Sequence, residues 1–117
     1  MAKPVIITAA LSGAATMKNQ NPAVPYTPEE FAEEAYKCWQ EGAAMVHVHA
    51  RADNGMATHE IDRIRATHDA IKEKCPDLIV NLSSAVGMGQ LAINDKAVFA
   101  IVIECHGYPP HSSISKY

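Results

Sequence analysis

Apolar residues along this chain follow two spacings in turn, one typical of strands and one typical of helices. Three short runs, at residues 5–11, 43–51 and 77–83, have the β-branched or alternating character of strands. Between them, over residues 27–42 and 60–74, apolar residues recur three and four positions apart, as on one helix face. This order, with a repeat of about 35 residues, indicates consecutive βαβ units. The pattern therefore predicts an α/β fold with a parallel sheet.

Residues near its two ends define the first predicted helix. Thr27 can cap the amino terminus, Pro28 suits the first helical position, and Glu30 completes a capping box. Gly42 supplies the carboxyl-terminal stop. Inside this helix Cys38 and Trp39 fit the apolar stripe, so we expect both to be packing residues.

The same pattern predicts which residues are buried. Residues 5–11 are almost all apolar, which is typical of a parallel strand covered on both faces. The buried stripe predicted for the second helix comprises Ile61, Ile64, His68, Ile71 and Cys75. On this stripe we expect His68 to be a hydrogen-bonded core residue, and we expect His59 to be exposed or to cap the helix.

Two histidines stand at the end of the second predicted strand. Because strand side chains alternate between faces, His47, His49 and Arg51 share one face. The histidine Cα atoms would lie about 7 Å apart, a spacing that lets both rings converge on one metal ion. A turn at residues 53–55 follows, which places the pair at the carboxyl end of the strand, where parallel α/β sheets bind ligands. Two histidines at a strand end can also be hydrogen-bonded residues without a metal, and the pattern leaves both interpretations open.

The third predicted strand ends in polar residues as well. Ile79, Asn81 and Ser83 share a face that turns polar toward the carboxyl end. Neighbouring strands with polar residues at the same edge favour a site role for Ser83, although serine also closes strands without any function.

Composition argues against some kinds of binding partner and favours one cellular compartment. A chain of 117 residues, 48% hydrophobic and 20% charged, suits one domain with a real core. The net charge is −3 and the basic residues are scattered, which argues against nucleic acid and anionic membrane as partners. Three widely spaced cysteines predict reduced thiols in a cytoplasmic protein. No apolar stretch approaches the length that spans a bilayer.

The βα rhythm fails beyond Gly89. Residues 97–104 form another apolar run, but only residues 90–96 separate it from the preceding glycine-rich loop. A parallel crossover needs about a dozen residues or more. We therefore divide the chain into residues 1–89, with the βα pattern, and a tail at 90–117 of uncertain structure.

Several stretches, taken in order, resemble one enzyme family. They are PVIITAA at 4–10 with Gly13, VPYTPEE at 24–30, EGAAMVHVHAR at 41–51, GMAT at 55–58 and IVNLSS at 79–84. With them, residues from about 3 to 89 resemble the amino-terminal third of the β-keto acid cleavage enzymes, best known for 3-keto-5-aminohexanoate cleavage in lysine fermentation.

The resemblance implies a (β/α)₈ TIM barrel with a zinc ion at its carboxyl face. It implies a transferase reaction in which a β-keto acid and acetyl-CoA give acetoacetate and a new acyl-CoA. On this resemblance His47 and His49 match the two zinc-binding histidines, and Ser83 matches a substrate-binding serine. The metal would act as a Lewis acid on the keto group.

The departures from the family pattern limit this expectation. The family places an acidic residue early in the first loop, whereas residues 13–16 here are Gly-Ala-Ala-Thr. The residue that would bind the polar end of the substrate therefore stays unassigned. A barrel of this type needs about 250 residues, and the family's glutamate ligand, arginine and catalytic aspartate find no position here. We therefore expect an incomplete barrel, from a truncated or frame-shifted product, with little or no activity alone and no assignable catalytic residue.

Two other functions fit the sequence. One is a non-enzymatic α/β module that self-associates, because three parallel strands leave two open edges that a homo-oligomer would cover. The other is a different metal-dependent hydrolase or aldolase, which the two histidines allow. The matches at residues 27–30 and 81–84 favour the cleavage family over this last alternative.

Overall fold

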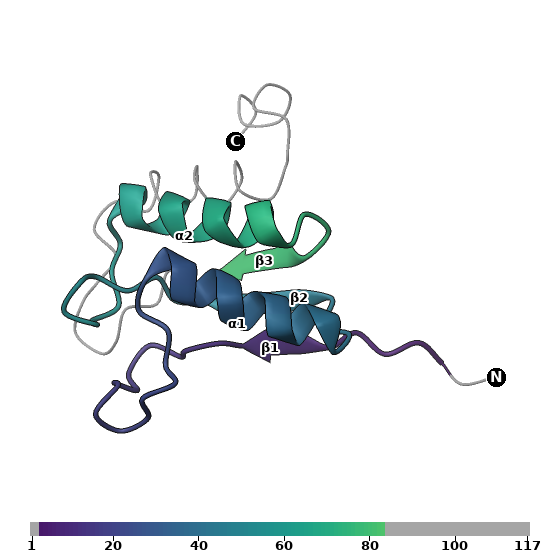
Figure 1. Ribbon diagram of the computed structural model, residues 1–117, viewed down its shortest axis with the longest axis horizontal. Helices are drawn as coiled ribbons and strands as arrows, with labels where there is room; N and C mark the ends of the chain where they lie inside the picture. Colours follow the sequence, from purple (N-terminus) through teal and green to yellow (C-terminus); the bar gives the residue numbers. More distant parts are fainter. Residues whose placement is uncertain (1–2, 84–117) are drawn as a thin grey trace, which may run out of the picture.

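A computed structural model describes residues 3–83. Its elements, in chain order, are β1 (Thr8–Ala10), α1 (Pro28–Gln40), β2 (Met45–Val48), α2 (Ile61–Lys74) and β3 (Ile79–Leu82). The three strands are parallel and lie in the order β1-β2-β3 (Figure 1). The predicted βαβαβ order and parallel sheet are therefore confirmed for the described part of the chain.

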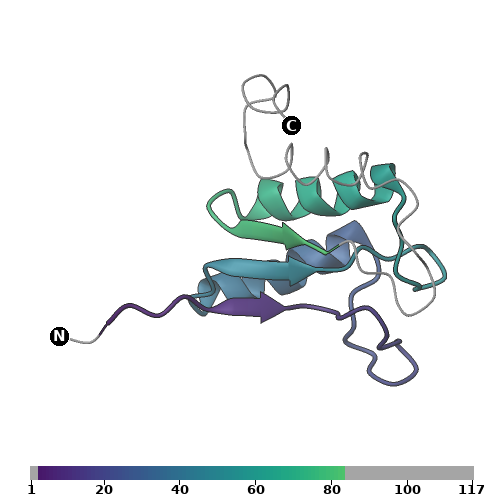
Figure 2. The same ribbon diagram turned by 180° about the vertical axis from the view of Figure 1, so that it is seen from behind.

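The sheet has one covered and one open face. Both helices pack on the same side of the strands (Figure 1), and the view from behind shows the strands with no described helix in front of them (Figure 2). Strand alternation divides the side chains accordingly. Val46, Val48 and Val80 are buried on the helix side, whereas Ile79 on the opposite face is 48% exposed. His47 and Asn81 lie on this open face as well.

The core lies between the helices and the sheet. Phe31 of α1, Ile71 of α2, and Val46 and Val48 of β2 are fully buried within one apolar cluster. Trp39 is partly buried against this cluster, so its predicted packing role is confirmed. His68 is 9% exposed, and its Nδ1 lies 2.9 Å from Asp69 Oδ1, which confirms a hydrogen-bonded core histidine.

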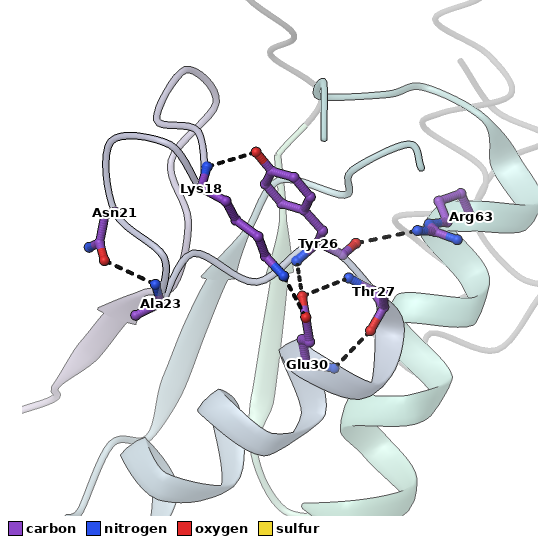
Figure 3. Close-up of polar contacts among 7 residues, drawn as sticks. All are labelled: Lys18, Asn21, Ala23, Tyr26, Thr27, Glu30 and Arg63. Carbon is purple, nitrogen blue, oxygen red and sulfur yellow. Dashed lines mark hydrogen bonds and ion pairs between the residues drawn. The ribbon is translucent and has the colours of Figure 1, made fainter. Parts of the chain in front are cut away.

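The amino terminus of α1 carries the predicted capping box. The backbone N–H of Glu30 donates to Thr27 Oγ1 at 3.2 Å, and the N–H of Thr27 donates to Glu30 Oε2 at 3.3 Å. Glu30 accepts two further hydrogen bonds, from the N–H of Tyr26 and from Lys18 Nζ (Figure 3). The carboxylate therefore fixes the loop before α1 as well as the helix end.

We expect Glu30→Gln to weaken folding in a pH-dependent way. The Lys18 hydrogen bond, followed by the Tyr26 N–H, lowers the pKa of Glu30 from its ordinary value of 4.5. Because the folded-state pKa is the lower one, the stabilisation is present above the unfolded value and is lost as the pH falls through the folded one.

The Glu30 side chain is 41% exposed, so water and salt screen its ion pair. Urea unfolding of the wild type and Glu30→Gln should therefore differ by at most about 1 kcal/mol at neutral pH, and the difference should shrink as the pH falls below the ordinary carboxyl value of 4.5. Glu29→Gln, which removes a carboxylate from the same helical turn, is the control and should show a smaller loss. A difference that stays constant across this range would contradict the proposed contribution of the carboxylate.

Three predictions of burial were wrong. Val5, Ile6 and Ile7 are 81%, 76% and 51% exposed, because β1 is an edge strand, begins only at Thr8, and has no helix over its second face among residues 3–83. Ile61 is 37% exposed because it is the first residue of α2. His59 makes no capping bond, since the N-cap of α2 is Glu60, and both its ring nitrogens are shielded from solvent.

The predictions for the tail fall outside the described residues. The apolar run at 97–104 and the boundary at residue 89 therefore stay predictions. Within residues 3–83, no helix is both long enough and apolar enough to cross a membrane.

Candidate metal centre

The two histidines lie where the loops leave the sheet. All three strand arrows point toward the edge at which the chain enters the loops after β1 and β2 (Figure 2). His47 is in β2, paired with Ala10 of β1 and Asn81 of β3, and His49 follows one residue after the strand. This placement at the carboxyl edge is the one predicted.

The imidazole rings converge on each other. Their Nε2 atoms lie 3.2 Å apart, and the ring planes meet at 75° with centroids 5.1 Å apart. Two imidazole nitrogens bound tetrahedrally to one zinc ion, each at about 2.0–2.1 Å, would lie about 3.3 Å apart. The pair therefore has the separation of two ligands of a single ion. The same contact can also be an N–H···N hydrogen bond between one protonated and one unprotonated nitrogen.

Asn81 fixes the proton on one of these rings. Its Oδ1 lies 2.7 Å from His47 Nδ1, and because an amide oxygen can only accept, this hydrogen bond requires a proton on Nδ1. The lone pair of His47 Nε2 then faces His49. Partners of this kind orient metal-binding histidines and make them better ligands. Sequence reasoning placed Asn81 on this face but missed its bond to His47.

The backbone around the pair is held from β1. His49 is only 8% exposed. The N–H of Leu11 donates to the carbonyl of His47 at 3.2 Å, and the Ser12 hydroxyl lies 3.5 Å from the carbonyl of His49. Both rings are therefore carried on backbone that neighbouring strands restrain.

Ser83 lies at the same edge, one residue beyond β3. Its backbone N–H donates to the carbonyl of Val48 at 2.8 Å, which places it beside the start of the loop that carries His49. The structure thus brings His47, His49 and Ser83 to one edge of the sheet. Their roles as metal ligands and substrate-binding residue stay predictions.

Within residues 3–83, this edge offers His47 and His49 as candidate ligands. Among residues 3–83, no group of three or more His, Cys, Asp or Glu side chains is arranged to hold a metal ion. His68 belongs to the helix side of the sheet, within α2. The two histidines would therefore fit two of the three protein ligands that a catalytic zinc site ordinarily has.

The sequence pattern of the beta-keto acid cleavage enzyme family matches residues 4–106 of this chain. The chain belongs to this family. The matched range continues past residue 89, where we placed the end of the resemblance, so the family pattern extends into the segment that follows β3.

Curated relatives include several enzymes of this family. The chain is 48% identical over 93 residues to a 3-keto-5-aminohexanoate cleavage enzyme of Fusobacterium nucleatum, a match that covers 78% of this chain and 34% of the relative. It is 48% identical over 86 residues to the enzyme of the same name from Acetoanaerobium sticklandii, a match that covers 72% of this chain and 32% of that relative. A 3-oxoadipate:acetyl-CoA acetyltransferase of Cupriavidus necator is 34% identical over 84 residues, a match that covers 72% of this chain and 30% of that relative. The chain thus spans about a third of the length of these relatives.

Proposed function

We propose that this chain forms part of a metal-dependent beta-keto acid cleavage enzyme that uses a β-keto acid and acetyl-CoA. The observation that carries the proposal is the pair of histidine Nε2 atoms, 3.2 Å apart, at the carboxyl edge of a parallel sheet. Family membership supplies the reaction class, because relatives of this chain are named for β-keto acid cleavage or for transfer with acetyl-CoA.

We further propose that the sheet is the first part of a (β/α)₈ barrel. Its helices lie on one face, and its open face carries His47 and Asn81, as the wall of such a barrel requires. The exposed Ile79 on that face supports the proposal, since further strands would cover it.

The residues of the proposed site have distinct tasks. His47 and His49 would hold zinc through Nε2, and the bound metal would supply a Lewis acid for the keto oxygen. Asn81 keeps the His47 proton on Nδ1, which leaves Nε2 able to bind. Ser83 supplies a hydroxyl at the same edge, where it can donate a hydrogen bond to the substrate.

A spectroscopic titration of the whole chain tests this function. Co²⁺ is the probe metal because its visible absorption reports changes in its ligands. We expect Co²⁺ to bind, and we expect acetoacetate, a β-keto acid, to alter the spectrum at concentrations where acetate, which lacks the keto group, does not. Equal responses to both acids would contradict recognition of the keto group, and absence of Co²⁺ binding would contradict the metal site.

Turnover is a separate matter. Because the described residues give two ligands where catalytic zinc sites ordinarily use three, we expect little or no acyl-CoA formation by this chain alone. Mass spectrometry of the CoA products, with a β-keto acid and acetyl-CoA as substrates, would measure it, and robust turnover would overturn this expectation.

Self-association remains the alternative. It is supported by the open sheet face and by the exposed apolar side chains that precede β1, which a second copy could cover. A chain that forms dimers but binds neither Co²⁺ nor acetoacetate would favour this alternative over the enzyme.

A further inference from the structure

Within residues 3–83, Arg51 is a buried cation without a carboxylate partner. Its side chain is 0% exposed, and no Asp or Glu among residues 3–83 forms an ion pair with it. Burial of a charge is costly unless other polar groups compensate for it. The groups around Arg51 must therefore offset the cost of removing its charge from water.

In the described part of the chain, backbone carbonyls rather than a carboxylate contact the Arg51 guanidinium. Nη2 lies within hydrogen-bond distance of the carbonyl oxygens of Ser12, Gly13 and Thr16, at 3.1, 2.7 and 3.1 Å. Nη1 donates to the carbonyl of Gly55 at 2.7 Å. The first three carbonyls belong to the loop after β1 and the last to the loop after β2, so one side chain joins both loops.

Arg51 is itself held from a second element. Arg63 of α2 donates from Nε to the carbonyl of Arg51 at 2.7 Å and from Nη2 to the carbonyl of Tyr26 at 3.4 Å (Figure 3 shows the second bond). The Tyr26 ring lies 5.8 Å from the guanidinium carbon. The loop after β1 is therefore restrained near its start by Arg51 and near its end by Arg63.

The restrained loop begins at the histidine pair. Leu11 donates to the carbonyl of His47, and the Ser12 hydroxyl lies 3.5 Å from the carbonyl of His49. We propose that Arg51 is a positioning residue that fixes residues 12–17 beside His47 and His49, so that this loop forms a defined wall for a β-keto acid bound there. The inference rests on the proposed function for its ligand, although the contacts of Arg51 with the loop are independent of it.

Lysine cannot replace arginine in this role. The guanidinium presents donors on a planar fork, which reaches carbonyls on two sides at once. A lysine ammonium keeps the charge but is a single nitrogen on a flexible stem. Arg51→Lys therefore separates the geometry of the fork from the positive charge. Arg65→Lys, the same replacement at an exposed position of α2, is the matched control.

The experiment combines hydrogen exchange with ligand titration on the whole chain. In Arg51→Lys we expect amide exchange of residues 12–17 to accelerate by about tenfold or more, while α1 and α2 stay as protected as in the wild type. We expect the affinity for Co²⁺ to stay within about twofold and that of the Co²⁺-loaded chain for acetoacetate to fall by about tenfold. Arg65→Lys should change none of these values.

Each contrary outcome has a separate meaning. Uniform acceleration across both helices would make Arg51 a general stabiliser of the fold and overturn the inference. Faster loop exchange with unchanged acetoacetate affinity would contradict the proposal that this loop forms a wall for the bound β-keto acid. A wild type that binds neither Co²⁺ nor acetoacetate would overturn the proposed function, and with it the ligand wall. Unchanged loop exchange in Arg51→Lys would overturn the restraint of the loop itself, whatever the ligand does.

Discussion

Replacing either His47 or His49 by alanine should abolish metal binding by this chain. We expect zinc to fall from about one ion per chain to nearly none, because a single imidazole leaves a zinc site without its second nitrogen. Elemental analysis after dialysis against micromolar zinc measures the stoichiometry, and titration with a competing chelator measures the affinity.

The neighbouring residues supply graded controls for this prediction. Asn81→Ala removes the acceptor of the His47 proton but no ligand, so we expect an affinity loss of about 10–100-fold with unchanged stoichiometry. His59→Ala removes a histidine that belongs to no metal-binding group among residues 3–83, and it should leave zinc unchanged. Equal zinc in the wild type and in both single histidine variants would contradict the site. A zinc-free wild type would leave the 3.2 Å contact as a hydrogen bond in which His49 donates to His47.

The features predicted correctly are those set by neighbours in the sequence. The cap of α1 was predictable because Thr27 and Glu30 lie three residues apart and satisfy each other. The shared face of His47 and His49 was predictable because it follows from strand alternation alone. Their place at the carboxyl edge followed from the parallel βαβ order, which is itself a consequence of the hydrophobic spacing.

The features that were missed depend on contacts between distant residues. Asn81 and His47 are 34 positions apart, and Arg51 reaches Ser12 across 39. No local pattern tells which carbonyls a buried arginine will contact. The burial expected for residues 5–11 failed for a related reason. An apolar run indicates what a strand can tolerate, whereas its exposure depends on which elements cover it.

At the carboxyl edge, different contacts position the histidine rings and the loops. The strands fix the spacing of the histidine rings through the pairing of His47 with Asn81 and through β1. The two arginines restrain the loops instead. Arg51 donates to the carbonyl of Gly13 in the loop after β1, and Arg63 of α2 donates to the carbonyl of Arg51. Metal affinity and ligand affinity should therefore respond to different substitutions. That separation is what the paired titrations of Asn81→Ala and Arg51→Lys would reveal.

Gly55→Ala should destabilise the fold more than any other glycine substitution in the described part of the chain. Gly55 has φ +85°, a left-handed conformation that costs other residues about 1–2 kcal/mol. A Cβ at this position would also overlap the Tyr26 ring, with the phenolic oxygen only 2.6 Å away. Tyr26 accepts the N–H of Lys18 and faces the Arg51 guanidinium, so displacing it would disturb the loop as well.

Two comparisons isolate the contribution of the overlap. Gly42 has φ +101°, and no atom lies within 4 Å of the place that a Cβ would occupy there, so Gly42→Ala measures backbone strain alone. We expect losses in the free energy of unfolding of about 1–2 kcal/mol for Gly42→Ala and about 3 kcal/mol or more for Gly55→Ala, measured by urea unfolding. In a Tyr26→Ala background the overlap is gone, so the cost of Gly55→Ala should fall to that of Gly42→Ala. An equal cost of Gly55→Ala in both backgrounds would show that strain, and not the contact with Tyr26, requires glycine in this loop.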